Sequence, residues 1–301
     1  MKAVQFSEYG GPEVLKLVET DAPHAGPGQI RVAVRTVGVN PAEWKIRAGY
    51  FQEFMPVEFP AGVGFEAAGI VDEVGEGVTD VAVGDAVFGH GPGALAEYTV
   101  LTYWAHKPED MPFDVAGGLA VASETAIRAL DYAGAKSGET VLICGAAGGV
   151  GTAAVQIARA RGIKVIGTAS AAKHDYLREL GAIPTTYEPG LADRVTSLAP
   201  QGIDAALDLA GAGIIPELVG LTGNALRVVS VVDFTAPEHG AVFTPTPQEH
   251  PERALEEAVR LYSEGALDLH IEKTFPMERI AEAHALSAEG HVTGKLVITV
   301  S

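Results

Sequence analysis

Four glycines occur within the eight residues CGAAGGVG at 144–151, between the apolar run TVLI and the alanine-rich stretch AAVQIARA. A strand, a glycine turn and a helix in this order point the first helical amides at an anion. Gly145 would begin the turn, and Gly151 would let the helix pack against the strand. Gly148 and Gly149 would let the backbone approach a pyrophosphate closely. The spacing is shifted from the common G-x-G-x-x-G, and an ordinary strand-to-helix turn is the alternative. The flanking elements favour a turn that binds a dinucleotide.

The residues after the next apolar run, KVIGT at 164–168, bear on which nicotinamide nucleotide would bind. An acidic residue there would accept hydrogen bonds from the ribose 2′-hydroxyl of NAD. This chain has Thr168, Ser170 and Lys173 in that place and no carboxylate that would repel a 2′-phosphate. We therefore expect NADPH as the cofactor, with these three residues among its contacts. The alternative is that Ser170 caps a helix and Lys173 is solvated.

The elements that would hold these residues alternate between helix and strand from near residue 115 onward. Apolar strands are expected at 140–144, 164–168, 204–210 and 227–232, and helices at 125–135 and 174–182. This alternation predicts parallel βαβ units. A further helix is predicted over residues 251–267, where Leu255, Val259 and Tyr262 recur at helical spacing.

The first third of the chain has a different pattern, with short segments rich in Val and Ile between glycine, proline or acidic turns. Strands are expected at 2–6, 30–39, 67–74, 86–89 and 96–101. Strands this frequent predict an antiparallel sheet or a small barrel. The closing strand KLVITV needs a sheet to join, and we expect it to return to this first domain. The predicted division is residues 1–122, a second domain over 123–265 and the return over 266–301.

Composition excludes several classes of partner. The 301 residues include 39 acidic and 21 basic side chains, for a formal charge of −18. An acidic surface repels nucleic-acid phosphates and anionic lipids, so we expect neither nucleic acid nor membrane as a partner. The single cysteine, Cys144, excludes an internal disulfide and a cysteine-rich zinc site. The chain shows no secretory signal pattern and no apolar run of roughly eighteen residues, which predicts a cytoplasmic protein.

Six segments together resemble the medium-chain dehydrogenase/reductases, in particular the zinc-independent quinone oxidoreductase branch. They are GVNPAEWKIRAGY (38–50), GFEAAGIVDEVGEGV (64–78), VGDAVFG (83–89), SETAIRAL (123–130), CGAAGGVG (144–151) and GHVTGKLVI (290–298). The resemblance covers nearly the whole chain. It implies an α/β protein with a GroES-like β-barrel domain, a Rossmann domain with a doubly wound parallel sheet, and an active site in the cleft between them. The strand and helix pattern suggests the same division.

The resemblance also bears on metal binding. Zinc-using members of the family carry a cysteine and a histidine where this chain has Asn40 and Phe65. Asn is a weak, neutral oxygen donor and Phe has no donor atom. The four clustered cysteines of the family's structural zinc lobe are also absent from the sequence, and Glu66 alone does not make a site. We therefore expect no metal ion.

Matching positions in these motifs imply roles for particular residues. Asn40 and Thr125 match residues near the nicotinamide ring, and Tyr187 matches a position that flanks the adenosine phosphate. Lys45 and Tyr50 are the candidate catalytic residues, since Lys45 and Phe51 stand where quinone reductases of the family often have tyrosines. Lys45 could donate to a developing oxyanion, although a lysine on a short helix is usually solvated. The pyrophosphate cradle of the family corresponds to Gly148, Gly149 and Val150.

The expected chemistry follows from the missing metal. Without a Lewis acid nothing stabilises the alkoxide that forms when an alcohol is oxidised. A quinone or an α,β-unsaturated carbonyl takes hydride at carbon, and hydrogen-bond donors suffice for the phenolate or enolate that results. We expect hydride transfer from NADPH to a quinone-like acceptor. An enoyl or alkenal reductase and a non-enzymatic NADPH-binding structural or sensor protein remain alternatives. The family resemblance further implies a homodimer.

Overall fold

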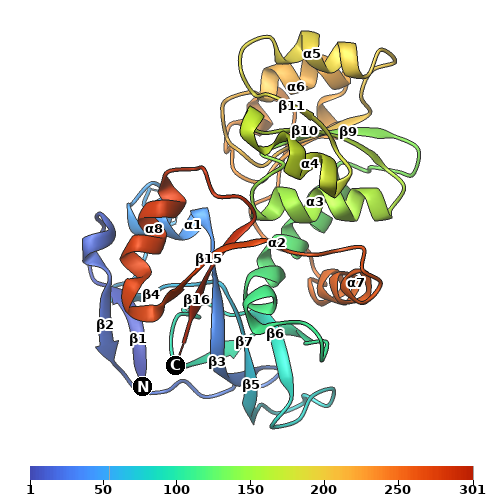
Figure 1. The fold of residues 1–301 in the computed structure, drawn as a ribbon. Helices are drawn as coiled ribbons and strands as arrows, with labels where there is room; N and C mark the ends of the chain where they lie inside the picture. The colour runs from blue at the N-terminus through green and yellow to red at the C-terminus, as the bar shows by residue number, and fades with distance from the viewer. Residues whose placement is uncertain (54, 301) are drawn as a thin grey trace. The chain divides into compact units, whose positions relative to one another are not determined.

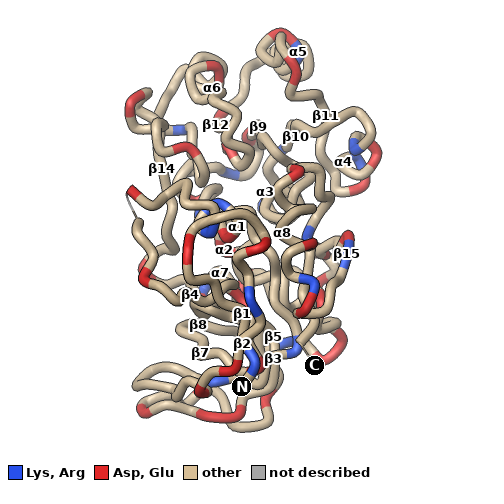
Figure 2. Tube along the Cα trace, turned by 90° about the vertical axis from the view of Figure 1, so that its left-hand side faces the viewer, with Lys and Arg blue, Asp and Glu red and all other residues tan. Residues whose placement is uncertain are grey.

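The computed structural model describes residues 1–53 and 55–300 and divides the chain into two compact units (Figure 1). The first unit contains Met1–Val121 and the chain from Leu269 onward, and the second contains Ala122–Asp268. The predicted boundaries after residues 122 and 265 differ from these by one and three residues. Acidic residues are spread along both units (Figure 2). Within the described residues, no helix combines the length and apolarity that crossing a bilayer requires.

The first unit is built from two β-sheets. One sheet has three antiparallel strands in the order β2-β1-β4, and the other has seven, in the order β15-β16-β3-β5-β6-β8 with β7 also paired to β3. Helices α1 (Pro41–Arg47) and α8 (Ile280–Ala288) belong to this unit. The strands are β1 (Lys2–Phe6), β2 (Lys16–Glu19), β3 (Ile30–Val39), β4 (Ala61–Gly62), β5 (Glu66–Val74), β6 (Ala86–His90), β7 (Tyr98–Leu101), β8 (Tyr103–His106), β15 (Ile271–Pro276) and β16 (Lys295–Thr299).

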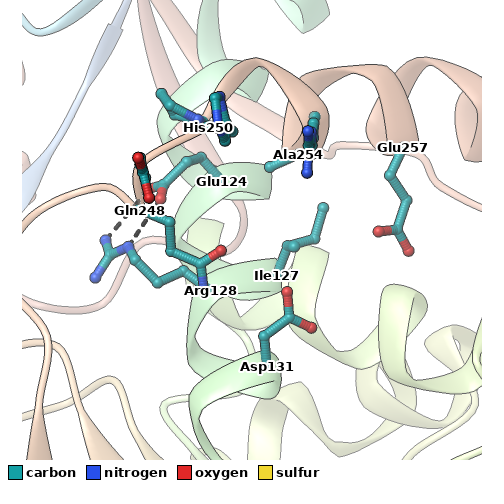
Figure 3. A pocket seen from close by; sticks show the side chains of 11 residues that line it. Glu124, Ile127, Arg128, Asp131, Gln248, His250, Ala254 and Glu257 are labelled. Carbon is teal, nitrogen blue, oxygen red and sulfur yellow. Dashed lines mark hydrogen bonds and ion pairs between the residues drawn. The ribbon is translucent and has the colours of Figure 1, made fainter.

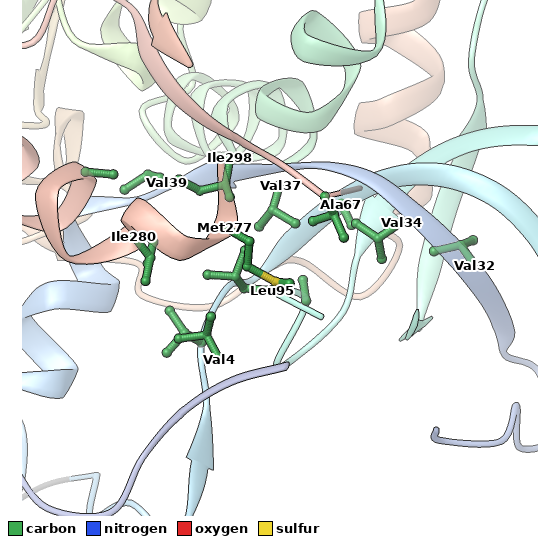
Figure 4. Packing of buried hydrophobic residues seen from close by; sticks show 14 of the residues in the cluster. Val4, Val32, Val34, Val37, Val39, Ala67, Leu95, Met277, Ile280 and Ile298 are labelled. Carbon is green, nitrogen blue, oxygen red and sulfur yellow. The ribbon is translucent and has the colours of Figure 1, made fainter. Parts of the chain in front are cut away.

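The C-terminal tail completes the first unit. Strand β16 pairs antiparallel with β3, with Leu296 opposite Val39 and Ile298 opposite Val37. The tail also fills the core, because Met277 and Ile298 pack with residues of the N-terminal strands in one buried apolar cluster (Figure 4). A fully buried side chain of this size contributes roughly 1.5–3 kcal/mol relative to an exposed one. The closing strand is therefore an integral part of the first unit's sheet and core.

The second unit is a parallel sheet in the order β11-β10-β9-β12-β13-β14. The strand order reverses direction between the adjacent central strands β9 and β12, which is where such sheets bind ligands at their carboxyl ends. Helix α2 (Phe113–Tyr132) contains the division between the units. The strands are β9 (Thr140–Cys144), β10 (Lys164–Thr168), β11 (Ile183–Thr185), β12 (Ala205–Asp208), β13 (Val228–Ser230) and β14 (Val242–Phe243). The helices are α3 (Gly149–Ala160), α4 (His174–Leu180), α5 (Leu191–Leu198), α6 (Ile215–Thr222) and α7 (Glu252–Ser263).

Helix α7 buries a different face from the predicted one. Its buried stripe includes Leu255 and Ala258, whereas Val259 and Tyr262 are only partly buried. The buried face also includes Ala254 and Leu261, and the prediction chose Val259 and Tyr262 instead because the alanines on the buried face carry a weak apolar signal. The helix itself begins one residue after the predicted start and ends four residues before the predicted end.

Candidate cofactor and active site

The glycine turn follows strand β9, as predicted, and the fold requires two of its glycines, Gly145 and Gly151, for different reasons. Gly145 has a φ of +82°, a conformation that favours glycine. A Cβ at Gly151 would lie 2.2 Å from the carbonyl oxygen of Gly145, so packing excludes a side chain there. A Cβ at Gly148 would meet only that same oxygen, at an ordinary 3.6 Å, and the backbone at Gly148 is extended. Neither packing nor backbone conformation explains the glycine at 148.

Helix α3 begins directly at this turn. Gly148 is its N-cap and makes no side-chain capping hydrogen bond, and its first turn carries no acidic residue. The first amides of a helix have no partner within the helix and carry partial positive charge. Gly148, Gly149 and Val150 are partly exposed. An anion at this turn would therefore meet backbone donors without a side chain in the way.

Thr168, predicted to contact a ligand phosphate, makes a structural contact with the glycine turn that was not predicted. Thr168 ends strand β10 and is only 2% exposed. Its hydroxyl accepts a hydrogen bond from the backbone N–H of Gly145 at 3.1 Å, and its carbonyl accepts one from Ala146 at 3.1 Å. Thr168 therefore stabilises the glycine turn through two hydrogen bonds to its backbone. Its position at the end of a strand gave no sign of this contact, because the partners lie in the turn that follows the neighbouring strand β9.

The other residues expected near the 2′-phosphate lie at the same edge of the sheet. Strands β9, β10 and β11 are parallel neighbours, so the segments that follow their carboxyl ends are adjacent. Ser170 and Lys173 follow β10 and are partly exposed, and Tyr187 follows β11 and is 57% exposed. Ser170 precedes a short 3-10 turn without making a side-chain capping hydrogen bond, so the capping role considered from sequence is not observed. These residues are placed where a nucleotide on the glycine turn could reach them.

Asp208 and Ser230 support the same edge of the sheet and were not predicted. Asp208, at the end of β12, is fully buried and accepts hydrogen bonds from the backbone N–H groups of Ala210 and Gly211. Ser230 donates its hydroxyl proton to the second oxygen of Asp208 at 2.8 Å. This pair fixes the loop after β12, beside the glycine turn. An acidic residue at the carboxyl end of an apolar strand was the available signal.

Thr125 lies in the second unit beside a buried ion pair. Arg128 and Glu124 are 2.8 Å apart and only 5% and 4% exposed, and Arg128 Nη2 donates to the Thr125 hydroxyl at 3.3 Å. Arg128 also donates to the hydroxyl of Thr244 at 2.8 Å. The pair forms part of the wall of a cavity of about 340 Å³ between α2 and the start of α7 (Figure 3). None of the predicted site residues lines this cavity.

The candidate catalytic residues Lys45 and Tyr50 meet around one tryptophan of the first unit. The Lys45 ammonium lies 5.7 Å from the centre of the Trp44 ring, and the Tyr50 ring packs edge-on against Trp44 with centres 5.6 Å apart. Tyr50 is 65% exposed. Trp44 was not singled out from sequence. The arrangement presents a cation and a phenol on one aromatic side chain.

Asn40 is the N-cap of α1 and lies in a buried polar cluster of the first unit. Its amide Nδ2 donates to Glu43 Oε1 and to Glu66 Oε1, both at 3.0 Å. Its Oδ1 accepts from the Lys295 ammonium at 2.6 Å, and that ammonium is 2.7 Å from Glu66. Both protons of the amide are therefore used, and its oxygen already accepts from the Lys295 ammonium. Asn40 cannot stabilise an oxyanion in this state.

Known proteins match both units. The alcohol dehydrogenase GroES-like domain model matches residues 26–110, and the zinc-binding dehydrogenase model matches residues 187–298. Human quinone oxidoreductase is 32% identical over 99% of this chain and 97% of its own length. The chain belongs to the quinone oxidoreductase-like branch of the medium-chain dehydrogenase/reductases. This membership makes it an oxidoreductase and confirms the predicted fold class, a GroES-like domain with a Rossmann parallel sheet.

Other relatives include two solved structures. The Escherichia coli quinone oxidoreductase complexed with NADPH is 25% identical, with a TM-score of 0.88 over 100% of this chain and 98% of that one. The CurK enoyl reductase is 26% identical, with a TM-score of 0.89 over 100% and 99% of the two chains. The pikromycin polyketide synthase component PikAII of Streptomyces venezuelae is 35% identical over 94% of this chain, which spans 8% of that protein. The family therefore includes members solved with NADPH.

The residues present do not fit the zinc ion that one matching model's description names. Phe65 has no donor atom, and the Asn40 oxygen and the Glu66 carboxylate both bind the Lys295 ammonium. Among the residues that the structure describes, no group of three or more His, Cys, Asp or Glu side chains could hold a metal ion. No step of the chemistry below is assigned to a metal.

Proposed function

We propose that this protein uses NADPH to reduce a quinone, or a similarly electron-poor acceptor, by hydride transfer and without zinc. The names of its full-length relatives, quinone oxidoreductases of about one-third identity, support the acceptor class. The NADPH complex of the Escherichia coli quinone oxidoreductase supports the cofactor. The absence of a carboxylate after β10, with Ser170 and Lys173 in its place, favours the phosphorylated nucleotide.

The observation that carries the proposal is the unexplained glycine at position 148. Its Cβ would point into space that no other part of the second unit occupies closely, directly at the uncapped start of α3. Neither the packing of the protein nor the backbone conformation requires a glycine at this position. A bound ligand that occupies the space of the missing side chain would require one. The backbone amides of Gly149 and Val150 would then donate to the pyrophosphate.

NADPH, when bound, supplies the hydride. The protein's own groups would hold the cofactor, orient the acceptor and offer donors to the oxygen that becomes negative. Lys45 and Tyr50 are the proposed donors, because they share the Trp44 surface and carry protons at the ammonium and the phenol. Replacing Lys45 by Met and Tyr50 by Phe should lower kcat, since each loses one donor to the developing oxyanion, on the order of tenfold or more.

A second candidate is an enoyl or alkenal reductase. It is favoured by the CurK enoyl reductase structure and by the polyketide synthase relative. Both reactions place hydride on an electron-poor carbon, so the same scaffold serves either. The acceptor panel described next separates them.

The deciding experiment measures oxidation of NADPH by absorbance with benzoquinone, a 2-alkenal and a simple ketone as acceptors. Turnover of the quinone above the alkenal supports the proposal, and the reverse favours the enoyl reductase. No turnover with any of them, together with NADPH binding, would favour a nucleotide-binding protein without catalysis.

A matched pair of variants tests the cofactor site. Gly148→Ala should fold normally but bind NADPH far more weakly, because its Cβ is tolerated by the protein and not by the pyrophosphate. Gly220→Ala is the control, since its Cβ would have no neighbour within 4 Å and Gly220 lies in helix α6, away from the glycine turn. Equal NADPH affinity in both variants would remove the argument from Gly148.

Light scattering tests the homodimer that we also propose from the family resemblance.

A further inference from the structure

The first unit contains a buried ammonium group, that of Lys295, whose role the proposed function does not explain. Lys295 is the first residue of β16 and its side chain is only 4% exposed. Its Nζ lies 2.7 Å from Oε1 of Glu66, which is 0% exposed, and 2.6 Å from Oδ1 of Asn40. Neither charge could be buried here alone, because an unpaired ion loses its hydration without compensation. The Lys295–Glu66 ion pair and the Asn40 amide therefore form one hydrogen-bonded cluster.

The contacts around Asn40 allow only one orientation of its amide. The NH2 group faces two carboxylates, those of Glu43 and Glu66, and the oxygen faces the Lys295 ammonium. Turning the amide over would point its protons at the ammonium and its oxygen at the carboxylates. The lysine distinguishes the two sides, since its ammonium faces the oxygen, whereas the two carboxylates face the NH2 group. Glu43 has a second neighbour in the buried His284, whose Nε2 lies 3.5 Å from Oε2 of Glu43.

Glu66 also ties this cluster to helix α2. Its second oxygen, Oε2, accepts a hydrogen bond from the backbone N–H of Val121 at 2.7 Å. Val121 lies inside α2 and is the last residue of the first unit before the chain enters the second. One carboxylate thus joins the start of β16, the start of α1 and the middle of α2.

We propose that Lys295 is a positioning residue that acts through Asn40. Its ammonium pairs with Glu66 and fixes the orientation of the Asn40 amide, a residue that the family resemblance assigns to the surroundings of the nicotinamide ring. The expected effect on turnover rests on the function proposed above. The fixed amide itself is a property of the free protein and is tested without any ligand.

The sequence provides a direct probe, because it contains only two asparagines, Asn40 and Asn224. Protein labelled with 15N at asparagine alone should give two side-chain NH2 signals. Asn224 is exposed and serves as the internal reference. The Asn40 protons should exchange with D2O about tenfold or more slowly than those of Asn224, because both donate to buried carboxylates.

The variant Lys295→Met should shift the Asn40 signals and speed their exchange about tenfold, leaving Asn224 unchanged. Because this variant leaves Glu66 buried without a cation, it can fail to fold, so the double variant Glu66→Gln/Lys295→Met is made alongside it to remove both charges. Lys164→Met is the matched control, an exposed lysine that also begins a strand. Unchanged Asn40 signals in the folded double variant would overturn the proposal.

Turnover provides the second readout. In the double variant Glu66→Gln/Lys295→Met, kcat should fall about tenfold with little change in KM for the acceptor. Adding Asn40→Ala to this double variant should lower kcat much less than Asn40→Ala does in the starting protein. The loss of Lys295 and the loss of Asn40 would then act through the same amide group. Additive losses would refute action through Asn40. If the starting protein neither binds nor oxidises NADPH, the proposed function fails, while the NMR result still decides the role of Lys295.

Discussion

Thr168→Val separates two roles for one hydroxyl, support of the glycine turn and contact with the 2′-phosphate of NADPH. Valine keeps the shape of threonine and removes the acceptor that the Gly145 N–H uses at 3.1 Å. Losing that hydrogen bond and leaving the N–H unpaired should lower the free energy of unfolding by about 1–3 kcal/mol. Because Gly145 begins the glycine turn that we propose binds the pyrophosphate, the affinity for nucleotide should fall as well, by up to about tenfold for 1.4 kcal/mol.

The decisive quantity is the ratio of NADPH to NADH affinity, measured by fluorescence titration of each nucleotide. We expect Thr168→Val to weaken both equally, since the side chain is 2% exposed and contacts the turn. Thr168→Ser is the control, because it keeps the acceptor oxygen, and it should behave like the starting protein. A loss confined to NADPH would show that the hydroxyl contacts the 2′-phosphate, and the description of Thr168 as a support would then be wrong.

Four further changes have definite expected outcomes. Arg128→Met leaves Glu124 buried without its cation and should lower the free energy of unfolding in urea by about 3–5 kcal/mol, with most of the loss recovered in Arg128→Met/Glu124→Gln; equal stability of the two variants would contradict this. Gly151→Ala should destabilise the second unit by about 1–3 kcal/mol, because its Cβ would overlap the turn's own carbonyl, and unchanged urea unfolding would show that the turn yields. Burial raises the pKa of the Cys144 thiol, so maleimide should modify it far more slowly in native than in denatured protein, and equal rates would show that the thiol is accessible. Dialysis against a chelator should leave NADPH oxidation unchanged, and a full equivalent of zinc by elemental analysis would overturn the metal-free proposal.

Local pattern was enough to predict most of the strands. The segments expected at 30–39, 140–144 and 164–168 match β3, β9 and β10 residue for residue. These runs are rich in Val and Ile and bounded by glycine or polar residues, so the chain itself marks where each strand ends. The glycine turn was predictable for the same reason, since its flanking strand and helix are both strong local signals.

Side-chain roles were harder to predict, because they depend on partners far along the chain. Asn40 and Lys295 are 255 positions apart, and only the pairing of β16 with β3 brings them together. The Glu124–Arg128 pair was within reach of sequence analysis, because a spacing of four on a helix brings two side chains together. The burial of this pair could not be predicted from the sequence, because it depends on the segment at Thr244, which is 116 positions from Arg128 and packs over the pair.

Asn40 and Phe65 show what a sequence comparison of metal ligands can establish and where it stops. The residue types at these positions are enough to argue against zinc, because donor chemistry belongs to the side chain alone. They do not say which residue pairs with the neighbouring Glu66, which is fully buried. A buried carboxylate is stabilised by a cation within hydrogen-bond distance. Lys295 supplies that cation from the other end of the chain, and its ammonium also binds the amide oxygen of Asn40, the residue that the family resemblance aligns with a zinc ligand.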